Sequence, residues 1–142
     1  MSFKGCILFR ITDSLATHGL GGLVSTGERS GIELVQGQLA ETGFGVLDVR
    51  DMFDATQPVS TYDKKIDDAI SVLERHGRVV VCCSAGQSRS NSIAIGVLIR
   101  KYGMDFYAAF ELVREKVPVV LIAPCHIDAL KELFKEIGRA HV

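Results

Sequence analysis

The stretch Arg78–Ser90 reads RVVVCCSAGQSRS, and the rest of the chain is interpreted outward from it. Its opening run, Arg78–Cys82, is short and β-branched, which predicts a strand buried on both faces, as in a parallel sheet. Small residues and one glycine follow, and they suit a tight loop. Ser90–Tyr102 is apolar nearly all round, which predicts a buried helix that ends at Gly103. A strand, a loop and a helix in this order indicate an α/β domain.

The flanking segments extend this pattern. Cys6–Ile11 and Val46–Val49 are apolar and β-branched, which predicts two further strands. Gly19–Gly31 holds five glycines, so we expect an irregular connection there. Apolar residues recur at helical spacing in four other segments: Ile32–Glu41, Tyr62–His76, Phe106–Lys116 and a last segment after Pro124. The expected fold class is α/β, with a small central, mostly parallel sheet flanked by helices.

Composition narrows the class of protein. The chain has 142 residues and a mass of 15.4 kDa, which suits a single domain over residues 1–142. Apolar residues make up 47% and charged residues 23%, which excludes a disordered chain and a collagen-like fibre. The net charge of -1 offers no bulk attraction to nucleic acid or to an anionic membrane, so we expect neither as a partner. The chain has no long apolar run and no signal-peptide core, and its four cysteines read as free thiols, which predicts a cytoplasmic protein.

The loop after Cys83 has the composition of an anion-binding site. Small residues let the backbone curl with its N–H groups pointing inward, and the N-terminus of the following helix adds its dipole. A thiol at the mouth of such a loop is stabilised as a thiolate. Arg89 opens the helix, where its charge is unfavourable unless a bound dianion lies between. The alternative is a buried cysteine followed by a surface arginine, but Gly86 between Cys83 and Arg89 favours the functional interpretation.

Cys83–Ser90 resembles the Cys-x-x-Gly-x-x-Arg-Ser loop of the cysteine-dependent protein tyrosine phosphatase superfamily, in the form typical of its dual-specificity branch. Ile11–Leu15 resembles the entry strand of that branch, and Val113 and Arg114 with the later Pro124 resemble its C-terminal helical segment. The resemblance implies a small stand-alone catalytic domain. It also implies hydrolysis of phosphotyrosine, and often of phosphoserine or phosphothreonine, without a metal or other cofactor.

The same resemblance implies a role for each loop residue. Cys83 would attack phosphorus and form a cysteinyl-phosphate. Arg89 would bind the phosphoryl oxygens together with the backbone amides, and Ser90 would hydrogen-bond the sulfur and help it leave. The alternative for Ser90 is helix capping, and both roles can hold. The substrate-binding amides would belong to Ser84, Ala85, Gly86, Gln87 and Ser88.

Two cysteines call for their own interpretation. The superfamily usually has histidine immediately before the nucleophile, where this chain has Cys82. Cys82 is either a small buried residue or a thiol that resolves an oxidised Cys83, and Cys125 is a second candidate for that resolving role. A zinc site on Cys82, Cys83, Cys125 and His126 is disfavoured, because adjacent cysteines chelate one ion poorly.

The resemblance also implies an aspartate, roughly thirty residues before the nucleophile, that protonates the leaving oxygen. Asp48, Asp51 and Asp54 precede Cys83 by 35, 32 and 29 residues. Asp48 falls within a predicted strand, where it suits a structural hydrogen bond. We prefer Asp51 to Asp54, because its spacing fits the dual-specificity branch better. The alternative for each is an ordinary solvated loop carboxylate.

The sequence thus predicts a stand-alone dual-specificity phosphatase that acts on phosphoprotein or phosphopeptide partners, with a monomer favoured. Only 82 residues precede Cys83, so we expect a shallow pocket that admits phosphoserine and phosphothreonine. Phosphoinositides and RNA 5′ ends are alternative substrates, although the variable loop positions carry no lysine. Rhodanese or arsenate-reductase chemistry is another enzymatic alternative. A phosphate-binding interaction module with little turnover is the alternative outside enzymes.

Overall fold

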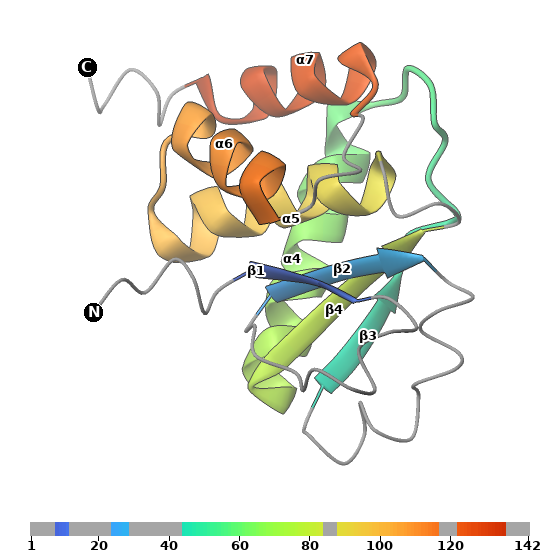
Figure 1. Cartoon of the computed structure of the whole chain (residues 1–142). Coiled ribbons are helices and arrows are strands. Elements are labelled where there is room, and N and C mark those ends of the chain that lie inside the picture. Colours follow the sequence, from blue (N-terminus) through green and yellow to red (C-terminus); the bar gives the residue numbers. More distant parts are fainter. Residues whose placement is uncertain (1–7, 12–23, 29–43, 84–87, 117–121, 136–142) are drawn as a thin grey trace.

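The centre of the protein is a four-stranded sheet in the order β1-β2-β4-β3. The computed structural model describes residues 8–11, 24–28, 44–83, 88–116 and 122–135. Neighbouring strands in this sheet all run parallel, which confirms the predicted α/β class with its small parallel sheet (Figure 1). The strands are β1 (Leu8–Ile11), β2 (Val24–Glu28), β3 (Phe44–Asp48) and β4 (Arg78–Cys83).

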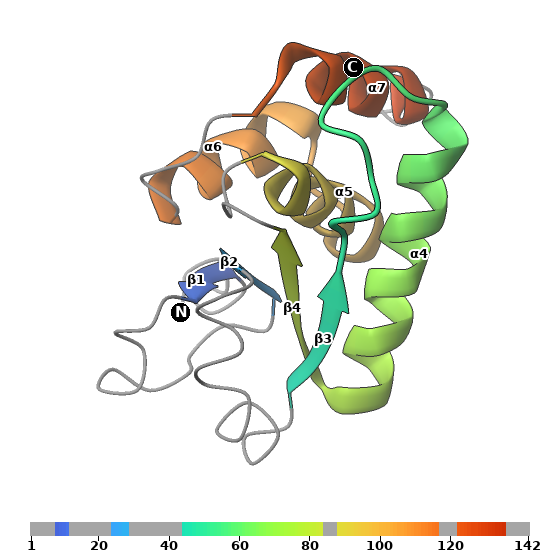
Figure 2. The ribbon, with the colours of Figure 1, turned by 90° about the vertical axis from the view of Figure 1, so that its right-hand side faces the viewer.

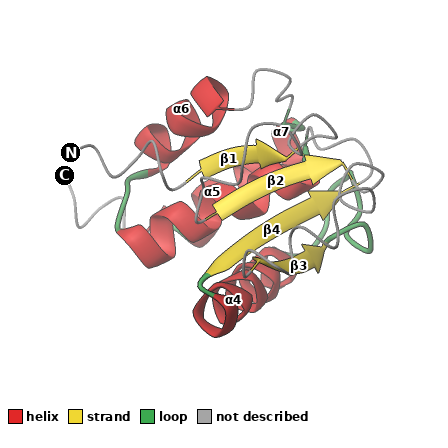
Figure 3. Cartoon of the chain, turned by 60° about the horizontal axis from the view of Figure 1, so that its bottom comes forward, coloured by secondary structure: helices red, strands yellow, loops and turns green. Residues whose placement is uncertain are grey.

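Two helices cover one face of the sheet. α4 (Val59–His76) packs against β3 and β4, and α5 (Arg89–Tyr102) packs against β2 and β4 (Figure 3). α6 (Phe106–Lys116) lies against α5 and β1, whereas α7 (Pro124–Leu133) lies against α4 and α5 (Figure 2). No helix of the described part of the chain is long and apolar enough to cross a membrane.

β4 and α5 form the buried axis of the fold. The three valines of β4 are fully buried, as the continuous β-branched run predicts. α5 is buried from Ser90 to Ile99 and ends at Gly103, whose φ of 69° lies in the left-handed region that favours glycine. Since both elements are rigidly packed, the loop between them starts and ends at fixed points on the carboxyl edge of the sheet.

One strand of the structure lies where the sequence predicts no regular element. Val24–Glu28 forms β2, within the segment 19–31 that was expected to be irregular. β2 lies between β1 and β4 and pairs with both, so neighbouring strands satisfy its backbone groups despite Gly27. Strand formation here depends on those neighbours more than on local propensity.

The other predicted elements occur in the structure with ends that are shifted by a few residues, or they lie outside the described residues. The second predicted strand begins at Phe44 rather than Val46 and ends at Asp48. The predicted helix over 32–41 lies outside the described residues. Asp105 caps α6 through its side chain, which accepts a hydrogen bond of 2.8 Å from the backbone N–H of Ala108.

Candidate active site

Cys83 is the last residue of β4, and its side chain is only 2% exposed. Its Sγ lies 3.3 Å from Oγ of Ser90, a fully buried residue in the first turn of α5. The thiol S–H donates to the hydroxyl oxygen, and the hydroxyl can instead donate to the sulfur when Cys83 is ionised. This pair joins the end of the strand to the start of the helix and gives the sulfur a hydrogen-bonding partner in either state.

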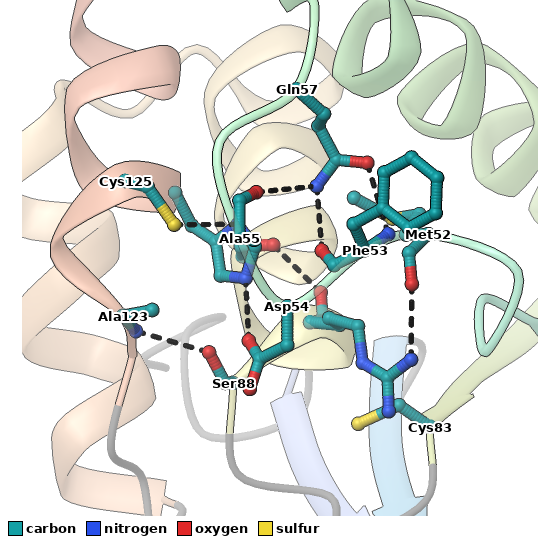
Figure 4. A network of polar contacts seen from close by, with 12 residues as sticks. Met52, Phe53, Asp54, Ala55, Gln57, Cys83, Ser88, Ala123 and Cys125 are labelled. Atoms are coloured by element: carbon teal, nitrogen blue, oxygen red, sulfur yellow. Dashed lines mark hydrogen bonds and ion pairs between the residues drawn. The ribbon is translucent and has the colours of Figure 1, made fainter.

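Of the loop between Cys83 and Ser90, the structure describes only the last residues, Ser88 and Arg89. Ser84, Ala85, Gly86 and Gln87 lie outside the described residues, so their amides stay a prediction. Ser88 is partly buried, and its hydroxyl oxygen accepts a hydrogen bond of 3.0 Å from the backbone N–H of Ala123. Ala123 immediately precedes α7, so this bond ties the end of the loop to the start of that helix (Figure 4).

Arg89 connects α5 to the segment that follows β3. One terminal nitrogen of its guanidinium donates to the backbone carbonyl oxygens of Arg50 and Met52, at 3.0 Å each. Figure 4 marks the bond to Met52 with a dashed line. The planar guanidinium carries five N–H donors, so these two contacts set its plane. Arg89 is therefore held against residues 50–57, a segment that we call the acid loop.

Asp54 is the carboxylate of the acid loop that reaches the Ser88–Arg89 segment. Its Oδ1 lies 2.8 Å from Nε2 of His126, the third residue of α7. The hydrogen bond from His126 lowers the pKa of Asp54, and partial burial opposes this effect. A hydrogen bond from the Ser88 side chain and the attraction of the Arg89 charge lower the pKa further. Figure 4 shows Asp54 beside Ser88.

The other two aspartates make different contacts. Asp51, which the spacing favoured, forms an ion pair of 2.7 Å with Lys65 of α4. Asp48 accepts a hydrogen bond of 3.0 Å from the backbone N–H of Arg50 and forms an ion pair with the Arg50 side chain. These contacts fit the structural hydrogen-bonding role that the sequence predicts for Asp48. The contacts among the described residues therefore connect Asp54, and not the preferred Asp51, to Ser88. The physical reason is that the chain turns after Val49. The number of residues before Cys83 therefore does not tell which aspartate side chain lies near Ser88.

Sequence reasoning missed a buried pair behind Asp54. From the sequence, His126 is a candidate only for a disfavoured zinc site, and Tyr62 is only an apolar position of a predicted helix. Both are fully buried, and the Tyr62 oxygen lies 2.5 Å from Nδ1 of His126. Gln57 donates to the same Tyr62 oxygen at 3.2 Å. The sequence shows only a histidine at an inward position of an amphipathic helix, and this pattern does not predict which residue it contacts.

The remaining cysteines differ in where their side chains point. Successive side chains of a strand face opposite sides of the sheet. Cys83 packs into the core cluster under α4 and α5 with Val79 and Val81, while the fully buried Cys82 lies outside that cluster. The geometry thus favours Cys82 as a small buried residue. Cys125 is partly buried, with Sγ 3.9 Å from Nδ1 of His126.

No group of three or more potential ligands able to hold a metal occurs among the described residues.

Comparison with known proteins relates this geometry to one family. Residues 34–136 match the family model described as dual specificity phosphatase, catalytic domain. The dual specificity protein phosphatase MPK-4 of Drosophila melanogaster is 36% identical over 73 residues, which are 51% of this chain and 19% of that protein. Dual specificity protein phosphatase 1B of Arabidopsis thaliana is 39% identical over 72 residues, 51% of this chain and 41% of that protein.

A solved structure agrees with these matches in its fold. The crystal structure of human DUSP28 superimposes with a TM-score of 0.64 at 21% identity, covering 75% of this chain and 87% of that one. At this identity the likeness concerns the fold alone. The matched segments span less than half the length of the fly and plant proteins.

Proposed function

The chain belongs to the family of dual specificity phosphatase catalytic domains, and on this premise we propose that it is a protein phosphatase working through a cysteinyl-phosphate intermediate. Its substrates are phosphotyrosine and phosphoserine or phosphothreonine in phosphoproteins. The observation that carries the proposal is the Cys83–Ser90 pair at the buried end of β4, with Arg89 opening the next helix. A nucleophile, a group that stabilises it as a leaving group and a fixed cation thus come from one strand–loop–helix unit.

In the first step the Cys83 thiolate attacks phosphorus while the bond to the ester oxygen breaks. The phosphoryl oxygens are held by Arg89 and by the amides of residues 84–88. The leaving oxygen takes a proton from Asp54. The carboxyl is an anion in the free protein because its pKa is lowered. A bound phosphate dianion raises that pKa by like-charge repulsion and so favours the acidic form.

In the second step a water molecule attacks phosphorus. Asp54, now a carboxylate, accepts a proton from this water. The sulfur of Cys83 leaves as a thiolate, and the hydroxyl of Ser90 donates a hydrogen bond to it. Inorganic phosphate is released and both residues return to their starting forms. Ser90 thus acts in this step, because that is when negative charge returns to sulfur.

We assign the general acid to Asp54 in place of Asp51. A general acid needs to reach the leaving oxygen directly or through one water. Asp54 lies beside Ser88, the residue that precedes α5, and the positive charge of Arg89 acts on its carboxylate. Asp51 is paired with Lys65 of α4 instead. These contacts support Asp54 as the residue that faces the bound phosphate ester.

The test compares the protein with Cys83→Ser on 4-nitrophenyl phosphate in the presence of a metal chelator. We expect the unsubstituted protein to turn over and the variant to lose at least roughly 10³-fold in rate, because the alcohol is a far weaker nucleophile. Equal low rates from the two proteins would identify a phosphate-binding module instead. A panel of phosphotyrosine, phosphothreonine, phosphoinositide and RNA triphosphate substrates then ranks the ester classes, and the peptides are expected to react fastest.

A further inference from the structure

The acid loop meets α7 through one hydrogen bond whose donor is buried. His126 is fully buried, whereas the side chain of Asp54 is 56% exposed. We propose that His126 is the positioning residue of the general acid: its Nε2–H holds Oδ1 of Asp54, so that the acidic proton resides on Oδ2, which is presented to the leaving group. The inference rests on the proposed function, since it takes Asp54 as the acid.

The direction of the hydrogen bonds follows from a chain that begins at the backbone. The N–H of Phe53 donates to Oε1 of Gln57 at 3.1 Å, and this bond identifies the oxygen of that amide. The amide nitrogen of Gln57 donates to the carbonyl oxygen of Phe53 at 2.6 Å and to the Tyr62 oxygen at 3.2 Å. With Gln57 as a donor to it, Tyr62 has its own O–H left to donate.

The tautomer of His126 follows from this direction. Tyr62 donates to Nδ1 of His126 at 2.5 Å, so Nδ1 is the acceptor nitrogen of a neutral imidazole. The proton of the ring is then on Nε2, where it faces Oδ1 of Asp54 at 2.8 Å. Four side-chain and backbone groups thus give one consistent assignment of donors, and Oδ1 of Asp54 is the final acceptor. The acidic proton is then favoured on Oδ2, because the carbonyl oxygen of a protonated carboxyl is a better hydrogen-bond acceptor than its hydroxyl oxygen.

Packing makes His126 a fixed point for a loop residue. Tyr62 belongs to α4 and His126 to α7, and their rings meet edge to face with centroids 5.6 Å apart. An exposed carboxylate on a loop samples several rotamers. A bond from a ring that two helices hold selects one of them, which saves orientation entropy when the proton is transferred.

Two amide variants that differ in length by one methylene test the inference. His126→Gln extends its amide to about the place of Nε2 and keeps a donor for Asp54. His126→Asn ends near Nδ1, so it keeps a partner for Tyr62 and loses the bond to Asp54. We measure kcat/KM of both variants on 2,4-dinitrophenyl phosphate and on phenyl phosphate, because kcat/KM reports the transfer to Cys83 and not the later hydrolysis that both esters share. The first ester has a leaving group that needs no proton, whereas the second requires general acid catalysis.

We expect His126→Asn to lower kcat/KM on phenyl phosphate roughly 10- to 100-fold, because misplaced groups cost factors of that size. Its kcat/KM on the dinitrophenyl ester is expected to change less than about 3-fold, and His126→Gln is expected to recover most of the loss. An equal loss on both esters would mean that His126 only supports the fold, and would overturn the inference.

An Asp54→Asn background separates this inference from the proposed function. With the acid removed, His126→Asn is expected to cost nothing more on phenyl phosphate, because the two residues act as one unit. If Asp54→Asn alone leaves phenyl phosphate hydrolysis unchanged, the proposed acid is wrong. If Asp54→Asn slows it and His126→Asn does not, the acid stands and the positioning role fails.

A third variant keeps the test decisive if His126→Asn fails to fold. Tyr62→Phe retains the ring that packs against His126 and removes the O–H that donates to Nδ1. Without that donor the imidazole can adopt the other tautomer and lose its N–H toward Asp54. A loss confined to phenyl phosphate supports the inference, and wild-type rates on both esters overturn it.

Discussion

The proposed nucleophile and the proposed general acid of this site are held in different ways. Cys83 and Ser90 belong to a buried strand and a buried helix, and they lie seven positions apart in the chain. Asp54 lies on the exposed acid loop, and its partner His126 is 72 residues away along the chain. The first position therefore follows from local secondary structure. The second requires the contact between the acid loop and α7, so it depends on how the helices pack.

The acid half of this contrast is tested first, because it predicts the largest selective effect. Asp54→Asn is expected to lower kcat/KM on phenyl phosphate by roughly 10²–10⁴, the usual contribution of a general acid. The kcat/KM on the dinitrophenyl ester is expected to stay near the wild-type value, because kcat/KM reports the transfer to Cys83 and not the later hydrolysis. Asp51→Asn is the matched control, since it removes a carboxylate three positions away that is paired with Lys65. A larger loss in Asp51→Asn than in Asp54→Asn would restore Asp51 as the acid.

Arg89 joins the two halves, so its replacement is expected to affect both esters. Arg89→Lys keeps the charge but loses the planar fork that binds phosphoryl oxygens. It also loses the fixed contacts to the carbonyl oxygens of Arg50 and Met52. We expect kcat to fall roughly 10²–10³-fold on phenyl and dinitrophenyl phosphate alike, as for removal of one transition-state donor. A loss on phenyl phosphate alone would place Arg89 with the acid rather than with the phosphate.

The packing under the nucleophile is tested through stability. A Cβ added at Gly96 of α5 would lie 2.2 Å from Cδ1 of Ile66 on α4, which is closer than atoms pack. Gly96→Ala is therefore expected to lower the free energy of unfolding by roughly 1–3 kcal/mol. Urea unfolding followed by circular dichroism measures this change. Unchanged stability would mean that α4 and α5 have room to separate, so the nucleophile half would be less rigid than we describe.

The smallest effect concerns the pH dependence of stability. Hydrogen bonding to His126 lowers the pKa of Asp54 below its ordinary value of 3.8. A carboxylate with a lowered pKa stabilises the folded state above that value, and the contribution is lost as the pH falls through the folded-state pKa. Since the side chain is 56% exposed, we expect less than about 1 kcal/mol.

Urea unfolding of the protein and of Asp54→Asn at several pH values checks this. The difference in stability between them is expected to be greatest near pH 6 and to narrow below roughly pH 4. A difference that stays constant over this range would contradict an ionised Asp54 bonded to His126.

Local patterns accounted for much of the fold. The buried β4, the helix that ends at Gly103 and the helix capped by Asp105 follow from runs of side chains and their capping residues. β2 did not follow, because a segment with Gly27 becomes a strand only when β1 and β4 pair with it. Local propensity measures what a segment prefers alone, and an interior strand is stabilised by its neighbours.

The residues of the candidate site also fall into a group that the sequence predicts and a group that depends on tertiary packing. Cys83, Arg89 and Ser90 could be read from the sequence, because strand, loop and helix place residues a few positions apart at fixed separations. The sequence offered Asp54 only as the less favoured alternative to Asp51. The contacts of Asp54 with His126 and of His126 with Tyr62 could not be predicted, because they join α4, the acid loop and α7 across 64 and 72 residues of chain. A hydrogen bond acts over about 3 Å of space, and residues so far apart come that close only when the helices that carry them have packed.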